Sequence, residues 1–328
     1  MTADATRAAE QFQTVFTGLE DNLKKVIVGH HRVIREVLVT LFSGGHALLE
    51  GVPGTGKTLL VKTLARSVDL SFGRIQFTPD LMPADVIGTF ILDVDDSGRR
   101  EFRFEQGPIF NQVILADEVN RATPKTQSAL LEAMAEQSVT LSGESRPLEE
   151  PFMVLATQNP IEMEGTYPLP EAQLDRFLMK IHISTEGVDQ LVGILDRTTG
   201  EKTPEVSIVG DRQSVIAMRQ LARQVVLSDP LKHFIARLVM ATHPGEKDAP
   251  PKVKRFVRFG ASPRGAQSIS LASKVMALIR NRLHVAEEDI RDVAFSTLRH
   301  RLVLNFEGEA EGLAGDDILE EVMETVGV

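Results

Sequence analysis

The sequence contains no cysteine and no tryptophan among its 328 residues. Without thiols the chain can form no disulfide, zinc–thiolate site or iron–sulfur cluster, and it has no cysteine nucleophile. Its apolar runs stay well short of the ~20 residues that a membrane-spanning helix needs. The N-terminal residues MTADATRAAEQFQ lack the basic start and the apolar stretch of a secretory signal. We therefore expect no integral membrane segment and a cytoplasmic location.

Aromatic residues and positive charge are both scarce. The chain has 16 phenylalanines and one tyrosine, and its 36 basic residues stand against 46 acidic ones, which gives a net charge of −10. An acidic surface repels a phosphate backbone, and few aromatic rings are present to stack on bases. We therefore expect no nucleic-acid partner.

Hydrophobic periodicity divides the chain into two parts. In the first part, short apolar runs alternate with helical patterns, and we predict strands at 46–50, 73–77, 112–116 and 152–157. Such alternation is typical of an α/β fold with a doubly wound parallel sheet. From residue 211 onward the periodicity is mostly helical, at 214–225, 230–242, 266–283 and 287–304. We predict an α/β domain over 1–185, a linker over 186–204 and a small all-α domain over 205–328.

The most specific motif is GVPGTGKT, residues 51–58, which matches the pattern G-x-x-x-x-G-K-[ST] in full. Its glycines let backbone N–H groups surround phosphate oxygens, Lys57 adds a positive charge at the β- and γ-phosphates, and the Thr58 hydroxyl can bind Mg²⁺. A chance glycine loop would lack the strand before it and the helix after it. We expect a nucleotide-binding loop with contacts from Gly51, Pro53, Gly54, Thr55, Gly56, Lys57, Thr58 and Leu59.

Two carboxylates end a later apolar strand. Asp117 and Glu118 directly follow the run VILA, residues 113–116. Beside a phosphate-binding loop, Asp117 is suited to hold Mg²⁺, and Glu118 can polarise the water that attacks the γ-phosphate. On their own the two acids would be solvated residues at a strand end. Together with the loop they predict hydrolysis rather than nucleotide binding alone.

Three further polar residues follow a strand, a turn and a helix start. Asn159, in TQNP, can contact an attacking water, but it is also a common turn residue. Arg176 follows an acidic turn and could equally form a surface ion pair of little energetic weight. Arg264, in GASPRG, comes just after a predicted helix start at Ser262, where a cation opposes the helix dipole. A cation in that position indicates an anionic partner, and a nucleotide is one candidate.

In this order the motifs resemble the MoxR family of AAA+ ATPases, over about residues 26–303. The most specific stretches are ADEVNRATPKTQSALLEAMAEQ and ATQNPIEMEGTYPLPEAQLDRF. The resemblance implies ATP and Mg²⁺ as cofactors and Asn159 as the sensor 1 residue. It implies that Arg176 is an arginine finger for the neighbouring subunit's nucleotide and that Arg264 is the sensor 2 residue.

The same resemblance places Val28 and Gly29 in the adenine pocket. Two positions depart from the family pattern, because His30 stands where the family often has glutamine and Thr123 stands where proline is common. Thr123 can still cap the helix that Pro124 begins. The histidine at position 30 leaves open which contact this position makes with the base.

Residues 87–109, IGTFILDVDDSGRREFRFEQGPI, alternate around the turn DDSG at 95–98 and predict a β-hairpin. It looks like the insertion of this clade that faces the central pore of a ring, although a purely decorative hairpin is the alternative. We expect Phe102 and Phe104 to pack against the hairpin's own partner strand. A second hairpin is predicted within 139–151.

The resemblance implies a P-loop (AAA+) domain followed by a helical lid, with ATP in the cleft between them. It implies an active homo-oligomer, a hexameric ring, and a chaperone-like role in remodelling or maturing a client protein complex. A protein with a von Willebrand factor A domain is the expected partner. Two alternatives stay open: a nucleic-acid motor of the same clade, and a nucleotide-gated scaffold that does not hydrolyse ATP.

Overall fold

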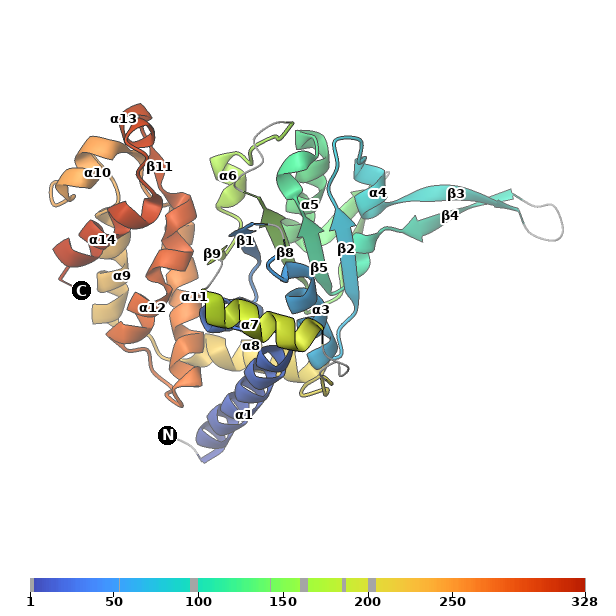
Figure 1. Ribbon diagram of the computed structural model, residues 1–328, viewed down its shortest axis with the longest axis horizontal. Coiled ribbons are helices and arrows are strands. Elements are labelled where there is room, and N and C mark those ends of the chain that lie inside the picture. The colour runs from blue at the N-terminus through green and yellow to red at the C-terminus, as the bar shows by residue number, and fades with distance from the viewer. Residues whose placement is uncertain are drawn as a thin grey trace.

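The computed structural model describes residues 3–52, 54–94, 100–141, 143–159, 165–184, 187–199 and 205–327 (Figure 1). Its centre is a five-stranded sheet in the order β2-β5-β8-β1-β9, in which all neighbouring strands run parallel. The strands are β1 (Ala47–Gly51), β2 (Phe72–Gln76), β5 (Val113–Asp117), β8 (Met153–Gln158) and β9 (Met179–Ile183). The predicted α/β fold with a parallel sheet is confirmed.

Helices cover both faces of this sheet: α1 (Ala3–Val26), α2 (His31–Ser43) and α3 (Lys57–Ser67) on one face, and α4 (Pro83–Ile87) and α5 (Pro124–Glu136) on the other. Alternate residues of one strand enter two separate apolar clusters. Leu49 and Leu115 pack with α1 to α3, whereas Leu48 and Ile114 pack with α4 and α5. The strands are therefore apolar on both faces, which is why they read as continuous apolar runs.

The C-terminal part is helical, as predicted. Its helices are α8 (Arg212–Gln224), α9 (Asp229–Met240), α10 (Pro251–Phe256), α11 (Pro263–Ile279), α12 (Glu287–Leu298), α13 (Phe306–Ala310) and α14 (Gly315–Thr325). A short antiparallel ladder joins β10 (Val257–Phe259) to β11 (Val303–Leu304). The prediction of one helix over 287–304 is wrong in its second part, because α12 ends at Leu298 and the 3₁₀ turn η3 (Arg299–Arg301) leads into β11.

This helical lid shares its hydrophobic core with the sheet domain. α8 and α11 pack against α1 and α2, and one apolar cluster runs from Leu49 and Val37 to Ile269 and Ile318. Because a large apolar interface disfavours relative motion of two domains, we expect the lid and the sheet to behave as one body. The domain boundaries at 185 and 205 stay a proposal.

The segment predicted as a linker contains the helix α7 (Val188–Thr198), which crosses the front of the molecule in Figure 1. The Gln190 side-chain amide donates to the carbonyl of Val28 at 2.8 Å. The Arg197 guanidinium donates to the carbonyls of Lys24 and Lys25 at 2.7 and 3.0 Å. Residues 187–199 are thus a packed element of the molecule, while residues 200–204 lie outside the described part of the chain.

Two hairpins leave the sheet: β3 (Gly88–Val94) with β4 (Arg100–Gln106), and β6 (Ser138–Leu141) with β7 (Glu144–Pro147). The first occupies the predicted range and projects from the body (Figure 1). Its predicted turn, 95–98, lies outside the described residues. Phe104 packs on Phe90 of the partner strand, with 5.5 Å between ring centroids. The expectation for Phe102 is wrong, because this side chain is 75% exposed.

Three short helical segments complete the described chain: η1 (Pro108–Phe110), η2 (Val119–Arg121) and α6 (Glu171–Leu174). η2 directly follows the two predicted acids, and α6 directly precedes Asp175 and Arg176. These segments therefore set the backbone direction at two of the predicted motifs. None of the helices that the structure describes is long and apolar enough to cross a membrane.

Candidate nucleotide-binding and hydrolysis site

The predicted phosphate-binding loop connects β1 to α3. Gly54 and Gly56 have φ angles of +84° and +77°, which residues with a side chain rarely adopt. Gly56 is also the N-cap of α3, so the first backbone N–H groups of that helix point toward the loop, where they favour an anion. Pro53, another predicted contact, lies outside the described residues.

Lys57 is the first residue of α3. Its ammonium donates to the carbonyl oxygens of Gly51 and Val52, the second at 3.3 Å, and so lies within the loop. Burial lowers the pKa of Lys57, and the nearby carboxylates of Asp117 and Glu118 oppose this shift. The structure therefore brings the predicted lysine and the two predicted acids together.

Asp117 and Glu118 lie at the end of β5, and Thr157 of the neighbouring strand β8 joins them. The Thr157 hydroxyl donates to Asp117 Oδ1 at 2.6 Å and accepts from the Glu118 N–H at 2.8 Å. Asn159, two residues further along the chain, is 8% exposed and follows the same end of β8. Thr157 was not predicted as a site residue, although the alternation of strand side chains would put it on the same side as Asn159.

Three more side chains that were not assigned from the sequence contact the acids. Arg74 forms an ion pair with Asp117 Oδ2 at 2.7 Å. Gln76 and Arg121 both donate to Glu118 Oε2, at 3.0 and 2.8 Å. No group among the described residues donates to Glu118 Oε1. That oxygen can therefore accept a hydrogen bond or a proton from water.

The backbone of Glu118 is itself unusual. Its φ of +56° lies in the left-handed region, which a glutamate rarely adopts because its Cβ crowds the backbone. The hydrogen bond from the Glu118 N–H to Thr157 and the ion pair with Arg121 hold it there. Residues held in such conformations cluster at functional sites, where the direction in which the side chain points matters more than the cost of the backbone strain.

A cavity of about 500 Å³ adjoins the loop. Its lining comes from the α1–α2 connection, the loop and α7, and it includes the predicted contacts Val28, Gly54, Thr55, Gly56 and Leu59. The predicted Gly29 does not line it, but its φ of +66° turns the chain between α1 and α2. His30, the position that departs from the family pattern, lines the cavity too. The size and the largely apolar wall suit a nucleotide base.

This cavity does not lie in the predicted cleft between sheet domain and lid. Its outer wall is α7, with lining residues from Gly187 to Arg197, and no described residue of 205–328 lines it. Gln190 lines the cavity and fastens α7 to the carbonyl of Val28. The cavity beside the loop that can accept a base thus lies between the sheet domain and α7, whereas the prediction placed ATP between the sheet domain and the lid.

Thr58 and Asp117 fit a Mg²⁺ ion by the chemistry of their donors. A hydroxyl and a carboxylate are hard oxygen ligands, and Mg²⁺ usually keeps several waters besides one or two protein oxygens. An all-protein metal cage is not present, because the described residues contain no group of three or more His, Cys, Asp or Glu that could hold a metal. The residues thus suit an ion shared with a nucleotide.

The structure places Arg176 and Arg264 away from the loop of their own chain. Both line a separate cavity of about 270 Å³ near α5, α8 and α11, and no loop residue lines it. Arg264 lies 3.6 Å from Asp175, and Arg176 donates to the carbonyl of Leu131. The predicted helix start is present, because the Ser262 hydroxyl accepts from the Arg264 N–H at 3.1 Å. This geometry does not support a sensor 2 contact with the nucleotide of the same chain.

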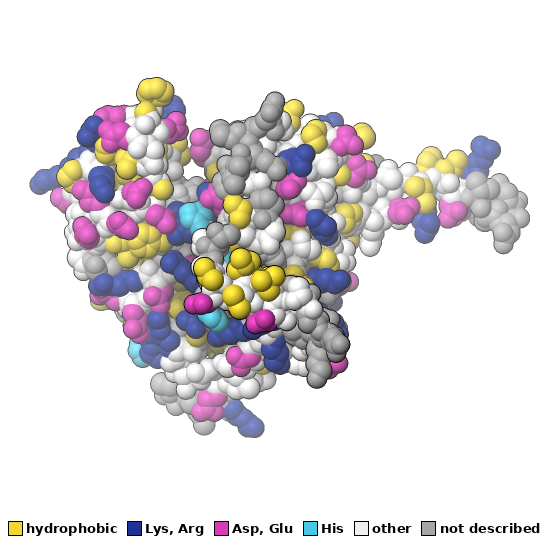
Figure 2. All heavy atoms as spheres, viewed as in Figure 1, with side chains coloured by type: hydrophobic (Ala, Val, Ile, Leu, Met, Phe, Trp, Pro, Cys, Tyr) yellow, Lys and Arg dark blue, Asp and Glu magenta, His cyan; other side chains and the backbone are white. Residues whose placement is uncertain are grey.

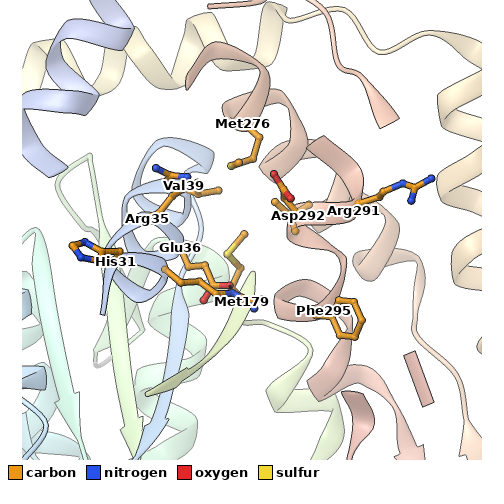
Figure 3. A pocket seen from close by; sticks show the side chains of 11 residues that line it. His31, Arg35, Glu36, Val39, Met179, Met276, Arg291, Asp292 and Phe295 are labelled. Carbon is orange, nitrogen blue, oxygen red and sulfur yellow. Dashed lines mark hydrogen bonds and ion pairs between the residues drawn. The ribbon is translucent and has the colours of Figure 1, made fainter. Parts of the chain in front are cut away.

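A third cavity, of about 480 Å³, lies between α2 and the lid helices α11 and α12. Figure 3 shows Glu36 on the α2 side and Met276 and Asp292 on the lid side. Its charged groups are satisfied locally, since Arg32 pairs with Glu36 at 3.0 Å and Arg280 pairs with Asp292. Because neither the loop nor the two acids line it, we assign this cavity no part in nucleotide binding.

Comparison with known proteins covers nearly the whole chain. The model of the ATPase family associated with various cellular activities (AAA) matches residues 46–179, and that of the AAA lid domain matches 252–322. Chaperone MoxR1 of Mycobacterium tuberculosis is 43% identical over 93% of this chain and 80% of its own. Protein MoxR of Paracoccus denitrificans is 32% identical over 88% and 89%. The crystal structure of a predicted ATPase from Cytophaga hutchinsonii has a TM-score of 0.91 at 42% identity, covering 98% of this chain and 97% of its own. The chain belongs to the MoxR family of AAA+ ATPases.

Proposed function

We propose that the protein hydrolyses ATP with Mg²⁺ as a ring-forming MoxR-type ATPase. The observation that carries this proposal is the meeting of Lys57, Asp117 and Glu118 at one end of the sheet, beside a base-sized cavity. Family membership supports an ATPase in general. Hydrolysis in particular is supported by Glu118, whose carboxylate keeps one oxygen to which no described group donates.

Catalysis in this proposal is mainly positioning and charge stabilisation. The N–H groups of the loop and the Lys57 ammonium hold the β- and γ-phosphates. Thr58 and Asp117 would hold Mg²⁺, which neutralises charge on the phosphate oxygens. Glu118 accepts a proton from the attacking water through Oε1, and Asn159 helps to orient that water.

Arg176 and Arg264 serve a neighbouring subunit in this proposal. Their cavity is separate from the loop of their own chain, so the γ-phosphate to which they add positive charge is that of the neighbour. Arginines supplied in trans are worth on the order of 10³–10⁵ in rate in related enzymes. A closed ring, which we propose to be a hexamer, lets every subunit give one such surface and receive another.

The cellular role that we propose is chaperone-like. The name of the relative Chaperone MoxR1 supports this class of role. We propose that the ring remodels or matures a client protein complex together with a von Willebrand factor A domain protein, with the projecting hairpin of β3 and β4 facing the pore. We further propose an AAA+ domain over 1–185, a lid over 205–328 and a cytoplasmic location.

Phosphate release and calorimetric ATP binding test the hydrolytic site. Lys57→Ala should lose ATP binding, because it removes the charged side chain that the loop directs at the phosphates. Glu118→Gln should bind ATP as before and lose turnover, because an amide cannot accept the proton. Lys62→Ala on α3 and Glu132→Gln on α5, both exposed and outside the site, are matched controls that should behave like the unchanged protein.

The same assay separates the alternatives. Turnover by Glu118→Gln at the full rate would mean that the base lies elsewhere. A rate that increases on adding DNA would favour a nucleic-acid motor, and ATP binding without turnover at every protein concentration would favour a scaffold. If the proposal holds, Glu118→Gln keeps the ring in its ATP-bound state and can be used to capture the client complex.

A further inference from the structure

The cavity that contains Arg176 and Arg264 is strongly cationic. Its described lining holds four arginines and a single carboxylate, that of Asp175. His46, which also lines it, adds no charge near neutral pH, because burial lowers its pKa to about 4. Within the described residues the cavity therefore carries an excess of positive charge.

The one carboxylate is already engaged. Asp175 accepts from the Arg301 guanidinium at 2.8 Å and from the Ser262 hydroxyl at 2.9 Å, and Arg264 lies 3.6 Å away. The buried Arg301 is thus neutralised by the half-buried Asp175 and belongs to the structural junction of sheet and lid. Among the described residues, neither Arg176 nor Arg223 forms an ion pair with Asp175.

Arg223 is the remaining arginine of the cavity, and no described contact accounts for its position there. It lies in the last turn of α8, is exposed and lines the cavity. No described carboxylate forms an ion pair with it, whereas Arg212, at the other end of α8, pairs with Glu149 at 3.4 Å. A basic residue in the last turn suits the dipole of α8, but the dipole alone does not require it to lie in a cavity with other arginines.

The surroundings of Arg223 are cationic as well. Burial is the main cause of the lowered pKa of Arg219 and of Lys274, and the charge of Arg223 adds to both shifts. Lys232 lowers the pKa of Lys274 further. The Glu150 carboxylate opposes the shift in the pKa of Arg219. The Lys274 ammonium donates to the Arg223 carbonyl at 2.9 Å. Like charges gathered in this way raise the free energy of the folded chain unless an anion neutralises them.

We propose that Arg223 is a third cation, beside Arg176 and Arg264, that contacts the polyphosphate of an ATP held by a neighbouring copy of this chain. The inference rests on the proposed function, because the anion must come from a ring neighbour. A polyphosphate fits because it offers several negative oxygens to several guanidinium groups at once. The loop of the same chain lines a different cavity, so the contact is between subunits.

The test is steady-state ATP hydrolysis by the full-length protein under conditions in which rings form. Arg223→Ala should lower kcat/KM by roughly tenfold to a hundredfold, the usual loss for one hydrogen bond to a charged group. Arg223→Lys keeps the charge and should lose less. Arg212→Ala removes a charge of the same kind from the same helix, outside the cavity, and should keep the full rate. Thermal unfolding and sedimentation show that each variant folds and assembles.

A mixing experiment establishes which subunit uses Arg223. Arg223→Ala has an intact loop, and Lys57→Ala has an intact Arg223. In a mixed ring, some interfaces therefore join the loop of an Arg223→Ala subunit to the Arg223 of a Lys57→Ala subunit. Activity above that of both parents supports the contact between subunits. If mixed rings form and no activity returns, Arg223 acts within its own chain and the inference is wrong.

One further variant separates this inference from the proposed function. If Arg223→Ala hydrolyses ATP at the full rate while Arg176→Ala is inactive, the inference fails and the arginine finger stands. If Arg176→Ala also keeps the full rate, the proposed contact between subunits fails as a whole. If both are slow and both recover on mixing with Lys57→Ala, the inference holds.

Discussion

Around Glu118 the side chains are arranged to leave one carboxylate oxygen for water. Gln76 and Arg121 both donate to Oε2, and Thr157 fixes the Glu118 backbone. A base that is already held in one orientation loses less entropy on reaching the transition state. In our proposal Arg121 is therefore a positioning residue for Glu118 within its own chain.

His46 is buried where β8 and α5 meet, and it makes a pH-dependent contribution to stability. Its Nδ1 accepts from the Val154 N–H at 2.9 Å, and its Nε2 donates to the Met134 carbonyl at 3.2 Å. Burial lowers its pKa from 6.5 to about 4, although the Met134 bond opposes the shift. The unfolded chain takes up this proton near pH 6.5 and the folded chain only near pH 4. We expect the free energy of unfolding to decrease by about 3 kcal/mol as the pH falls through this window.

Urea unfolding at pH 7, 6, 5 and 4 measures this loss. The comparison is His46→Gln, whose side-chain amide keeps a donor and an acceptor but does not titrate. The unfolding free energy of this variant should decrease less between pH 6.5 and 4. Equal decreases in both proteins would show that other groups cause the acid sensitivity.

Site residues that are neighbours in the chain could be predicted from the sequence. Lys57 belongs to a glycine loop and Glu118 to the end of an apolar run, so the local pattern indicates the chemistry. Arg74 and Thr157 could not be predicted in this way. Both contact Asp117 only because β2 and β8 lie on either side of β5, and no local pattern specifies the order of strands in a sheet.

Among the elements, α7 differs most from the predicted organisation. Val188, Leu191, Val192 and Leu195 stand at helical spacing, but the nearby Gly200 favours a linker. This spacing does not indicate which side of the helix is buried, because the outer side of α7 is apolar as well. Figure 2 shows this outer surface as a hydrophobic patch. Only the folded chain reveals that the inner side closes the base cavity.

The inner side of α7 is expected to contribute to ATP affinity. Ile194 lines the cavity and is 37% exposed, whereas the adjacent Leu195 does not line it and is 51% exposed. Ile194→Ser should weaken ATP binding about tenfold, because burying one aliphatic side chain against a base is worth roughly 1–2 kcal/mol. Titration with a fluorescent ATP analogue in the Glu118→Gln background measures the affinity without hydrolysis.

Leu195→Ser is the control for this measurement. It removes a similar apolar side chain from the same turn of α7, and it lowers helix propensity somewhat more than Ile194→Ser does, because leucine is the better helix former. Its affinity should stay close to that of the parent. If both variants bind ATP equally weakly, the cause is loss of α7 structure, and the assigned contact between Ile194 and the base is wrong.

For the molecule as a whole, helical periodicity predicted the lid but not how it is attached. The lid was expected to be a separate domain, with ATP in the cleft between it and the sheet domain. Instead it shares one apolar cluster with α1, α2 and the sheet, and Asp175 joins the sheet side to Ser262 and Arg301 of the lid. Which helices share a core depends on their faces in three dimensions, and this packing directs Arg176 and Arg264 into one cavity away from the loop.

This separation leads us to expect that hydrolysis depends on assembly. One chain carries the loop, the acids and the base cavity, while Arg176 lies in another cavity. Specific activity should therefore increase with protein concentration, in step with the fraction of rings measured by analytical ultracentrifugation. Arg176→Ala should form rings and bind ATP, yet stay slower by about 10³-fold or more at every concentration, because the charge of the transition state lacks its cation.

The control for this prediction is Arg212→Ala, an exposed arginine that pairs with Glu149 and lines none of the three cavities described above. It should follow the concentration dependence of the unchanged protein. Specific activity that stays constant while the fraction of rings increases would contradict a cation supplied in trans. The stabilising charge would then come from the same chain, where Arg74 and Arg121 already contact Asp117 and Glu118.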